Sequence, residues 1–265
     1  MTEKSKFMGV ASSPQSTDAP HDHFERLVNI PGTGPIDEIA TTMDAITHIR
    51  GFMADLDPYD LREGGPLDVQ PGLTPTEFYE RCLRDRLQRS SFWKNAEVIC
   101  TGNGLALVHR LNEPLVCKSE IDVRHFDLQL KIIHTSLPSD PDQGGVCMMP
   151  RVPGSVNTKH GDYRPVVQLA QGTPITHQQF VEFAERMIAD PMTVILETLF
   201  GGTRIKPCPI CRQDGSSLMP VQKGRFVKCK KCEKYSMGDF YRTILKDDDT
   251  INQLTTKEVH HEFIN

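Results

Sequence analysis

Long hydrophobic runs are missing from this sequence of 265 residues. A helix that spans a bilayer needs about 18 or more consecutive apolar residues, and no run in the chain approaches that length. The first residues, MTEKSKFMGVASSPQSTDAPHDH, also lack the apolar core of a secretory signal. We therefore expect no membrane partner and a cytoplasmic location.

Internal repeats and coiled-coil heptads are absent as well. What is present is an ordinary globular composition, with 38% hydrophobic and 25% charged residues. Predicted strands and helices interleave and hairpins occur among them, which favours an α+β fold, in the sense of a mixed α/β core.

The chain contains eight cysteines, and in a reducing compartment these indicate metal ligands or buried thiols before disulfides. Cys208, Cys211, Cys229 and Cys232 form two CxxC pairs separated by seventeen residues. Two thiolates on each tight turn can reach one ion, and two such pairs complete a tetrahedral shell. The spacing predicts a zinc ribbon whose Zn²⁺ is structural, because protein ligands fill all four positions.

The net charge of −5 hides a strong asymmetry. Residues 204–234 carry nine Arg and Lys against Asp214 and Glu233, which gives +7 and leaves −12 for the rest. Cations beside aromatic rings suit single-stranded nucleic acid. The residues expected to bind it are Arg225, Phe226, Lys228, Lys230 and Lys231. The alternatives are a solvated basic surface on a zinc-stabilised strut and a protein-docking module.

Composition divides the chain into five expected parts. Residues 1–24 are rich in Ser, Pro, Thr and Asp and are predicted to be disordered. A core at 25–175, a helical connector at 176–202, the zinc ribbon at 203–245 and a C-terminal tail at 246–265 follow.

Local patterns predict several elements of the core. Helical spacing is seen at 36–50 and 120–137, and FMADLD is typical of a strand that ends in acids. Thr74, followed by Glu77, predicts a capping box ahead of an amphipathic helix. The segment VICTGNGLALVHRL, residues 98–111, predicts a hairpin with Asn103-Gly104 in a type I′ turn.

Two carboxylates at the end of the FMADLD strand suggest a metal site. Asp55 and Asp57 are two residues apart, so their side chains project from the same side of the strand. Two metal ions held by such carboxylates can clamp the attacking and leaving oxygens of a phosphoryl transfer. Strand-end acids are also often solvated caps, and the motif alone does not separate the two interpretations.

Downstream segments add features suited to phosphate. The TGNG loop contains glycines that let backbone N–H groups approach a phosphate. The acidic loop PSDPDQGG offers Asp140 or Asp142 as a third carboxylate, whereas Asp122 is less favoured because it begins a helical stretch. The segment RVPGSVNTKHG then places Arg151, Lys159 and His160 around a Pro-Gly turn.

The ordered set FMADLDP, TGNGLALVHRLNEP, an acidic loop and MPRVPGSVNTK resembles the catalytic core of the archaeo-eukaryotic primase superfamily, in its plasmid and phage primase-polymerase branch. The resemblance covers about residues 45 to 170. It implies an RRM-like core, often joined to zinc-binding or helical modules. The implied activity is that of a DNA primase or primase-polymerase, a nucleotidyltransferase that makes primers on single-stranded template during DNA replication.

The resemblance also assigns roles and partners. Asp55 and Asp57, with Asp140 or Asp142, would hold two Mg²⁺ or Mn²⁺ ions. Nucleoside triphosphate or template would be held by Thr101, Gly102, Asn103, Gly104, Arg110, Arg151, Asn157 and Lys159. Single-stranded DNA and nucleoside triphosphates are the expected partners, with a replicative helicase as a further one and the host cytoplasm as the location of a phage or plasmid protein.

One position departs from the family pattern. The second family motif ends in a histidine that contacts nucleotide phosphates, and Ala106 occupies that position here. Strand parity places His109 on the opposite face and Arg110 on the same face as Ala106. The sequence is therefore compatible with a weakened enzyme, with an engineered alanine, and with a catalytically weak or inactive adaptor that binds nucleic acid through its ribbon in replication or transcription.

Overall fold

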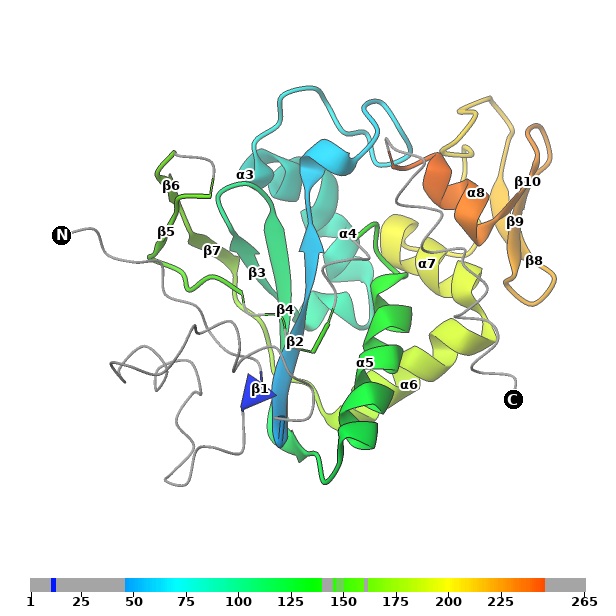
Figure 1. Ribbon diagram of the computed structural model, residues 1–265. Helices are drawn as coiled ribbons and strands as arrows, with labels where there is room; N and C mark the ends of the chain where they lie inside the picture. Colours follow the sequence, from blue (N-terminus) through cyan, green and yellow to red (C-terminus); the bar gives the residue numbers. More distant parts are fainter. Residues whose placement is uncertain are drawn as a thin grey trace. The chain divides into compact units, whose positions relative to one another are not determined.

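The computed structural model describes residues 11–12, 46–139, 145–146, 148, 150–159 and 162–245 (Figure 1). Asp140, Asp142, His160, most of the helix expected at 36–50 and the expected tail lie outside these residues. Antiparallel sheets and several helices make up the described chain. The expected α+β class is confirmed at that level.

The chain forms two compact units, each assembled from several segments. Unit 1 comprises Met1–Asp55, Asn95–Lys131 and Gln143–Val181 in their described parts. Unit 2 comprises the described parts of Leu56–Lys94, Ile132–Asp142 and Glu182–Asn265. The strand that carries Asp55 ends where the chain passes from unit 1 to unit 2.

Unit 1 contains a five-stranded sheet in the order β1-β2-β4-β3-β7. Its strands are β1 (Ala11–Ser12), β2 (His48–Leu56), β3 (Glu97–Cys100), β4 (Leu105–Val116) and β7 (Val167–Ala170). The predicted hairpin is β3 and β4, with Glu97 opposite Val108 and Cys100 opposite Leu105. Two short strands, β5 (Val156–Asn157) and β6 (Arg164–Pro165), pair separately.

Aromatic rings pack on one face of this sheet. Phe52 of β2 lies 6.1 Å from Phe126 of α5 (Glu120–His134) and 5.1 Å from Phe180, between ring centroids. His109 lies on the same face, fully buried and 5.1 Å from Phe52. Burial lowers the pKa of His109 to about 3, which confirms the parity argument that this residue belongs to the core.

Unit 2 begins with a 3₁₀ turn, η2 (Pro58–Asp60), and an interrupted helix: α3 (Pro75–Phe78), a π-helical turn, η3 (Tyr79–Leu83), and α4 (Arg84–Arg89). The predicted capping box is confirmed, since Thr74 N–H donates to Glu77 at 3.0 Å and Glu77 N–H donates to the Thr74 hydroxyl at 3.2 Å. A second 3₁₀ turn, η4 (Trp93–Asn95), follows.

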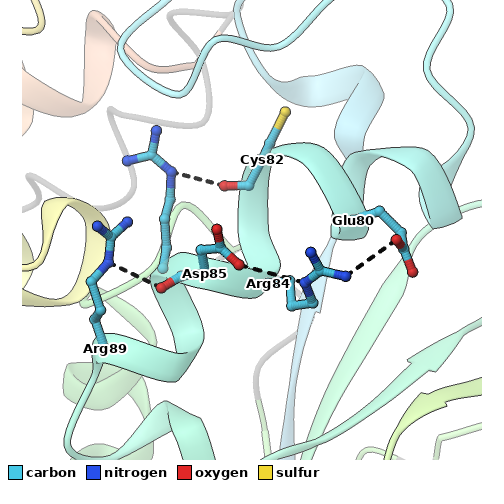
Figure 2. A network of polar contacts seen from close by, with 6 residues as sticks. Glu80, Cys82, Arg84, Asp85 and Arg89 are labelled. Carbon is cyan, nitrogen blue, oxygen red and sulfur yellow. Dashed lines mark hydrogen bonds and ion pairs between the residues drawn. The ribbon is translucent and has the colours of Figure 1, made fainter.

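Exposed ion pairs line this helix, as Figure 2 shows. Arg84 contacts Glu80 at 3.3 Å and Asp85 at 3.5 Å, and Arg89 Nε donates to the Asp85 carbonyl at 3.0 Å. Arg86 instead turns to α7 (Pro191–Phe200), where its guanidinium donates to the Leu199 carbonyl. These contacts stabilise the helix and its packing and involve none of the expected site residues.

The cysteine module forms a three-stranded sheet in the order β10-β9-β8. Its strands are β8 (Leu218–Val221), β9 (Phe226–Cys229) and β10 (Lys234–Ser236), and α8 (Met237–Arg242) follows directly. Two longer helices, α6 (His177–Ala189) and α7, precede the module as expected. No helix in the described residues is long and apolar enough to cross a bilayer.

Candidate functional site

The two carboxylates of the acidic motif occupy different local settings. Asp55 is the penultimate residue of β2 and is half-buried. Asp57 follows the strand with an extended backbone and caps η2, because its carboxylate accepts the Tyr59 N–H at 2.9 Å. The capping role foreseen as the alternative interpretation is therefore present for Asp57.

Asp55 of β2 and Ala106 of β4 belong to the same face of the sheet. Cys117 N–H donates to the Thr47 carbonyl at 2.8 Å, and a Cβ on Gly51 would lie 3.3 Å from Arg110 Cα. The strands therefore run antiparallel. Met53 lies in one apolar cluster with Ala106, and Asp55 is two residues from Met53 along β2, so Asp55 and Ala106 belong to the same face of the sheet.

Ala106 itself is fully buried in an apolar cluster. The cluster contains Met53, Ile99, Ala106, Val108 and Val166, with Met148 packed against it. A polar ring at position 106 would have to enter this packing and lose its hydration. The position that would face a nucleotide phosphate in the resembled family is filled here by the sheet's own apolar side chains.

The TGNG loop differs from the predicted type I′ turn. Cys100 and Leu105 are the last paired residues, so four residues connect the strands instead of two. Gly102 has a positive φ of 91°, whereas the φ of Asn103 is not positive, as a type I′ turn would require it to be. Thr101 closes the loop, since its N–H donates to the Gly104 carbonyl at 2.9 Å and its hydroxyl accepts the Gly104 N–H at 3.2 Å. This side-chain bond explains why the prediction was wrong.

The segment 151–164 contacts this loop directly. Asn157 is buried, and its Nδ2 donates to the Thr101 carbonyl at 2.7 Å. Arg164 Nη1 donates to Asn103 Oδ1 at 2.6 Å. A Cβ on Gly102 would lie 2.8 Å from Arg164 Cβ and 3.2 Å from Asn157 Cβ, so only glycine fits between them. Two motifs about fifty residues apart are thus joined in unit 1.

Residues 152–155 of that segment form the predicted Pro-Gly turn. Ser155 N–H donates to the Val152 carbonyl at 3.1 Å, with Pro153 and Gly154 at the centre and Gly154 at a φ of 87°. This is the pattern of a type II turn. Arg151 is half-buried, which lowers its pKa, while the nearby charge of Asp55 opposes that effect. Lys159 is exposed, and its N–H donates to Asn157 Oδ1 at 3.0 Å.

Arg110, which was expected to bind nucleotide, and Asp122, the less favoured third carboxylate, are hydrogen-bonded to other parts of the chain. Arg110 donates to Glu97 Oε2 from Nε at 3.2 Å and from Nη2 at 3.0 Å, at the end of the hairpin away from the TGNG loop. Asp122 accepts the N–H groups of Lys118 and Ser119 at 2.8 and 3.0 Å, and the first of these bonds contributes most to lowering its pKa. The structure does not bring Arg110 to the loop, and Asp122 caps α5.

The four cysteines of unit 2 have the geometry of a zinc site. Their sulfurs lie within 4.8 Å of one another, with 3.8 Å between Cys208 and Cys232 and 3.9 Å between Cys211 and Cys229. A tetrahedron with Zn–S bonds of about 2.3 Å has edges of about 3.8 Å, whereas a disulfide needs about 2.05 Å. The donor set therefore fits one structural Zn²⁺, as the spacing predicted.

Thiol environments within the cluster are unequal. A hydrogen bond with Cys232 lowers the pKa of Cys211 to about 6, whereas burial raises the pKa of Cys208. Lys231 N–H donates to Cys229 Sγ at 3.4 Å, and such a hydrogen bond to the sulfur stabilises a thiolate ligand. Such a set would release protons on binding a cation.

Basic side chains of the ribbon have distinct contacts. Phe226 and Lys228 point to one face of β9, and Lys234 lies opposite Lys228 with its Nζ 3.8 Å from the Phe226 ring centroid. Lys231 Nζ donates to the Asp214 carbonyl at 2.6 Å, while Arg225 and Lys230 are exposed. The strand register is what places Lys234 on this face.

Comparison of the chain with protein-family models, with curated proteins and with solved structures found no match in any of the three. The functional interpretation therefore rests on the residues and contacts described above.

Proposed function

We propose that the protein is a DNA-dependent primase or primase-polymerase with an RRM-like core. It would synthesise primers on single-stranded template by two-metal nucleotidyl transfer, using Asp55, Asp57 and a third carboxylate from Asp140 or Asp142. The order of elements supports this proposal. Along the chain β2, α3–α4, β3, β4, α5 and β7 follow a β-α-β-β-α-β pattern, and β4 lies between β2 and β3 in the sheet.

The observation that carries the proposal is the junction of two motifs in unit 1. Asn157 and Arg164 bind the TGNG loop, and Gly102 permits their close approach. Each motif by itself is ordinary turn chemistry. Their direct contact, with Arg151 close enough to Asp55 to affect its own pKa, is what a phosphate-binding site beside a metal site requires.

Each residue would have a defined part in the reaction. Bound Mg²⁺ or Mn²⁺ would activate a 3′-hydroxyl and neutralise charge on the departing pyrophosphate. Among the described residues, the four cysteines form the only group of three or more metal-ligating side chains, so Asp55 and Asp57 need the third carboxylate. Arg151, Lys159 and the amides of Gly102 and Asn103 would orient the triphosphate, which positions the reacting atoms before chemistry.

Titration calorimetry of a nucleoside triphosphate in Mn²⁺ tests this assignment. Asp55→Asn and Asp57→Asn remove one charge each, and asparagine keeps the N-cap at position 57. We expect each variant to weaken metal-dependent nucleotide binding by about tenfold or more. Asp85→Asn, on the exposed surface of α4, is the matched control and should bind as the wild type does.

A second function is favoured by the burial of Ala106. Because apolar side chains fill the position of the expected histidine, the chain would also serve as a primase-like adaptor that binds nucleic acid through its ribbon. This candidate predicts binding of single-stranded DNA that is independent of Mn²⁺ and nucleotide. The log-log salt slope should be near −0.7 per phosphate neutralised. Nucleotide binding that is lost in Asp57→Asn would exclude it.

The ribbon is proposed to hold single-stranded template in both cases. Lys228, Lys230 and Arg225 offer exposed charges, and Phe226 offers a ring once Lys234 moves off it. A zinc-stabilised protein-interaction module would instead show no binding to single strands at low salt.

A further inference from the structure

The loop that follows the acidic motif in unit 2 is held in a defined, tightly turned shape. Gly64 N–H donates to the Val69 carbonyl at 2.8 Å, Gly65 N–H to the Arg62 carbonyl at 3.1 Å, and Asp68 N–H to the Gly65 carbonyl at 2.9 Å. Gly64 and Asp68 have positive φ values of 61° and 58°. We call Arg62–Val69 the clamp loop; it begins five residues after Asp57.

Arg212 of the zinc ribbon reaches into this loop. Its Nη2 lies 2.9 Å from the Gly64 carbonyl oxygen, 2.8 Å from that of Gly65 and 2.7 Å from Asp68 Oδ1. A charged donor thus joins two carbonyls and a carboxylate that the chain's turns bring together. The Gly65 carbonyl also accepts the Asp68 N–H, so Arg212 is a second donor to it, whereas none of the loop bonds described above uses the Gly64 carbonyl.

The first cysteine pair positions Arg212. Arg212 directly follows Cys211, and its N–H donates to the Cys208 carbonyl at 2.8 Å, closing the CxxC turn. Its φ of 53° lies in the left-handed region, which non-glycine residues adopt uncommonly and mostly in turns. Ser216 Oγ accepts the Cys208 N–H at 3.0 Å and supports the same turn. Folding of a small zinc knuckle depends on its metal, so the position of Arg212 depends on zinc.

A second contact ties the other side of the loop to the chain that follows the ribbon. Arg62 N–H donates to the Ile244 carbonyl at 2.7 Å, and Leu61 forms an isolated antiparallel bridge with Leu245. These residues come directly after α8, which starts where β10 ends. The clamp loop is therefore attached to the module both at its first knuckle and after its last strand.

We propose that the zinc ribbon is a clamp for the loop that follows Asp57, and that Arg212 is the positioning residue through which zinc occupancy sets the order of that loop. The ribbon thereby acts on its own chain, in addition to any nucleic acid it holds. The coupling rests on zinc binding at the four cysteines, and its effect on catalysis rests on the proposed function.

Hydrogen–deuterium exchange of the zinc-loaded full chain, read on peptides that cover 61–70, tests the clamp. In Arg212→Ala with one zinc per chain, we expect the amides of Gly64, Gly65 and Asp68 to exchange about tenfold faster. Arg204→Ala removes an exposed arginine of the same module and should leave the loop unchanged. Chelation of zinc from the wild type should accelerate exchange in both the ribbon and the loop.

A variant on the loop side keeps the test decisive if Arg212→Ala loses zinc. Asp68→Asn leaves the ribbon sequence intact and tolerates positive φ, and it should accelerate loop exchange with zinc retained. The proposal would be overturned if the clamp loop of zinc-loaded Arg212→Ala, or that of Asp68→Asn, exchanged its amide hydrogens at the same rate as in the wild type. If exchange responds as expected while the wild type incorporates no nucleotide, the clamp stands and the proposed catalytic function fails.

Discussion

At the scale of single residues, Ala106 decides how the candidate site can work. It is buried within an apolar cluster, at the position where the resembled family has a phosphate-binding histidine. Under the proposed function, the loss of one charged hydrogen bond would weaken nucleotide binding by about one to two decades and would leave the proposed metal carboxylates in place. The fold of this chain is therefore compatible with a slow enzyme and with an inactive adaptor.

Ala106→His is expected to destabilise the protein. A larger polar ring must enter close apolar packing, which costs about 1 to 3 kcal/mol of unfolding free energy. Urea denaturation measures the change, with Glu113→His, at an exposed position of the same strand, as the control. Unchanged stability with tighter nucleotide binding would show that position 106 is open to the ligand.

Gly102→Ala is expected to loosen the junction of the two motifs. The new Cβ would meet Arg164 and Asn157 at 2.8 and 3.2 Å and would also sit at a positive φ. Gly72→Ala separates the two effects, because φ there is also positive, at 72°, and no atom lies within 4 Å. We expect Gly102→Ala to lower the unfolding free energy by about 1 to 3 kcal/mol more than Gly72→Ala. Equal losses would mean that close approach is unimportant.

His109 is expected to make stability depend on pH. Its pKa is about 3 in the folded chain because of burial and about 6.5 when unfolded. The unfolded chain therefore takes up the proton first, so the neutral ring contributes full stability above pH 6.5 and less as pH falls toward 3. Between pH 7 and pH 5 the unfolding free energy should drop by about 2 kcal/mol from this residue.

Denaturation of His109→Leu at both pH values measures that drop. The variant should lose about 2 kcal/mol less than the wild type on acidification, whereas His125→Gln, on the exposed side of α5, should behave as the wild type does. Parallel pH dependence in wild type and His109→Leu would contradict the buried neutral assignment.

At the scale of elements, sequence patterns correctly predicted the features that depend on residues close together in the sequence. The capping box at Thr74, the strand before Asp55 and the Pro153-Gly154 turn each depend on neighbours in sequence, and each is present. The TGNG turn was predicted wrongly because the Thr101 hydroxyl outweighs the Asn-Gly preference. The contact of Arg164 with Asn103 spans sixty residues, and no periodicity or spacing signals such a pair.

Zinc removal is expected to melt the ribbon sheet while the sheet of unit 1 stays folded. Besides Cys229, the three ribbon strands bury only Leu218 and Val227, so metal binding supplies most of the folding free energy of this sheet. Alkylation of the four cysteines by iodoacetamide, followed by mass spectrometry, should be slow in the zinc-loaded chain and rapid after chelation. The buried Cys100 of β3 is the internal control. Rapid alkylation of all four thiols before chelation would argue against zinc.

At the scale of the whole molecule, composition indicated an α+β chain with a basic module, and the described residues have that character. The two compact units could not be predicted, because each one collects segments that are far apart in sequence. Asp140 and Asp142 lie outside the described residues, so the choice of the third carboxylate stays a prediction. The central claim concerns the proposed two-metal nucleotidyl transfer.

Primer synthesis from labelled nucleotides on single-stranded DNA in Mn²⁺ tests that claim most directly. We expect the wild type to extend products and Asp55→Asn to lose about 100-fold or more in rate, since one metal ligand is removed. Asp85→Asn should retain the wild-type rate. Equal inactivity of wild type and Asp55→Asn across several templates, with zinc bound and both chains folded, would contradict the account and leave the adaptor as the function.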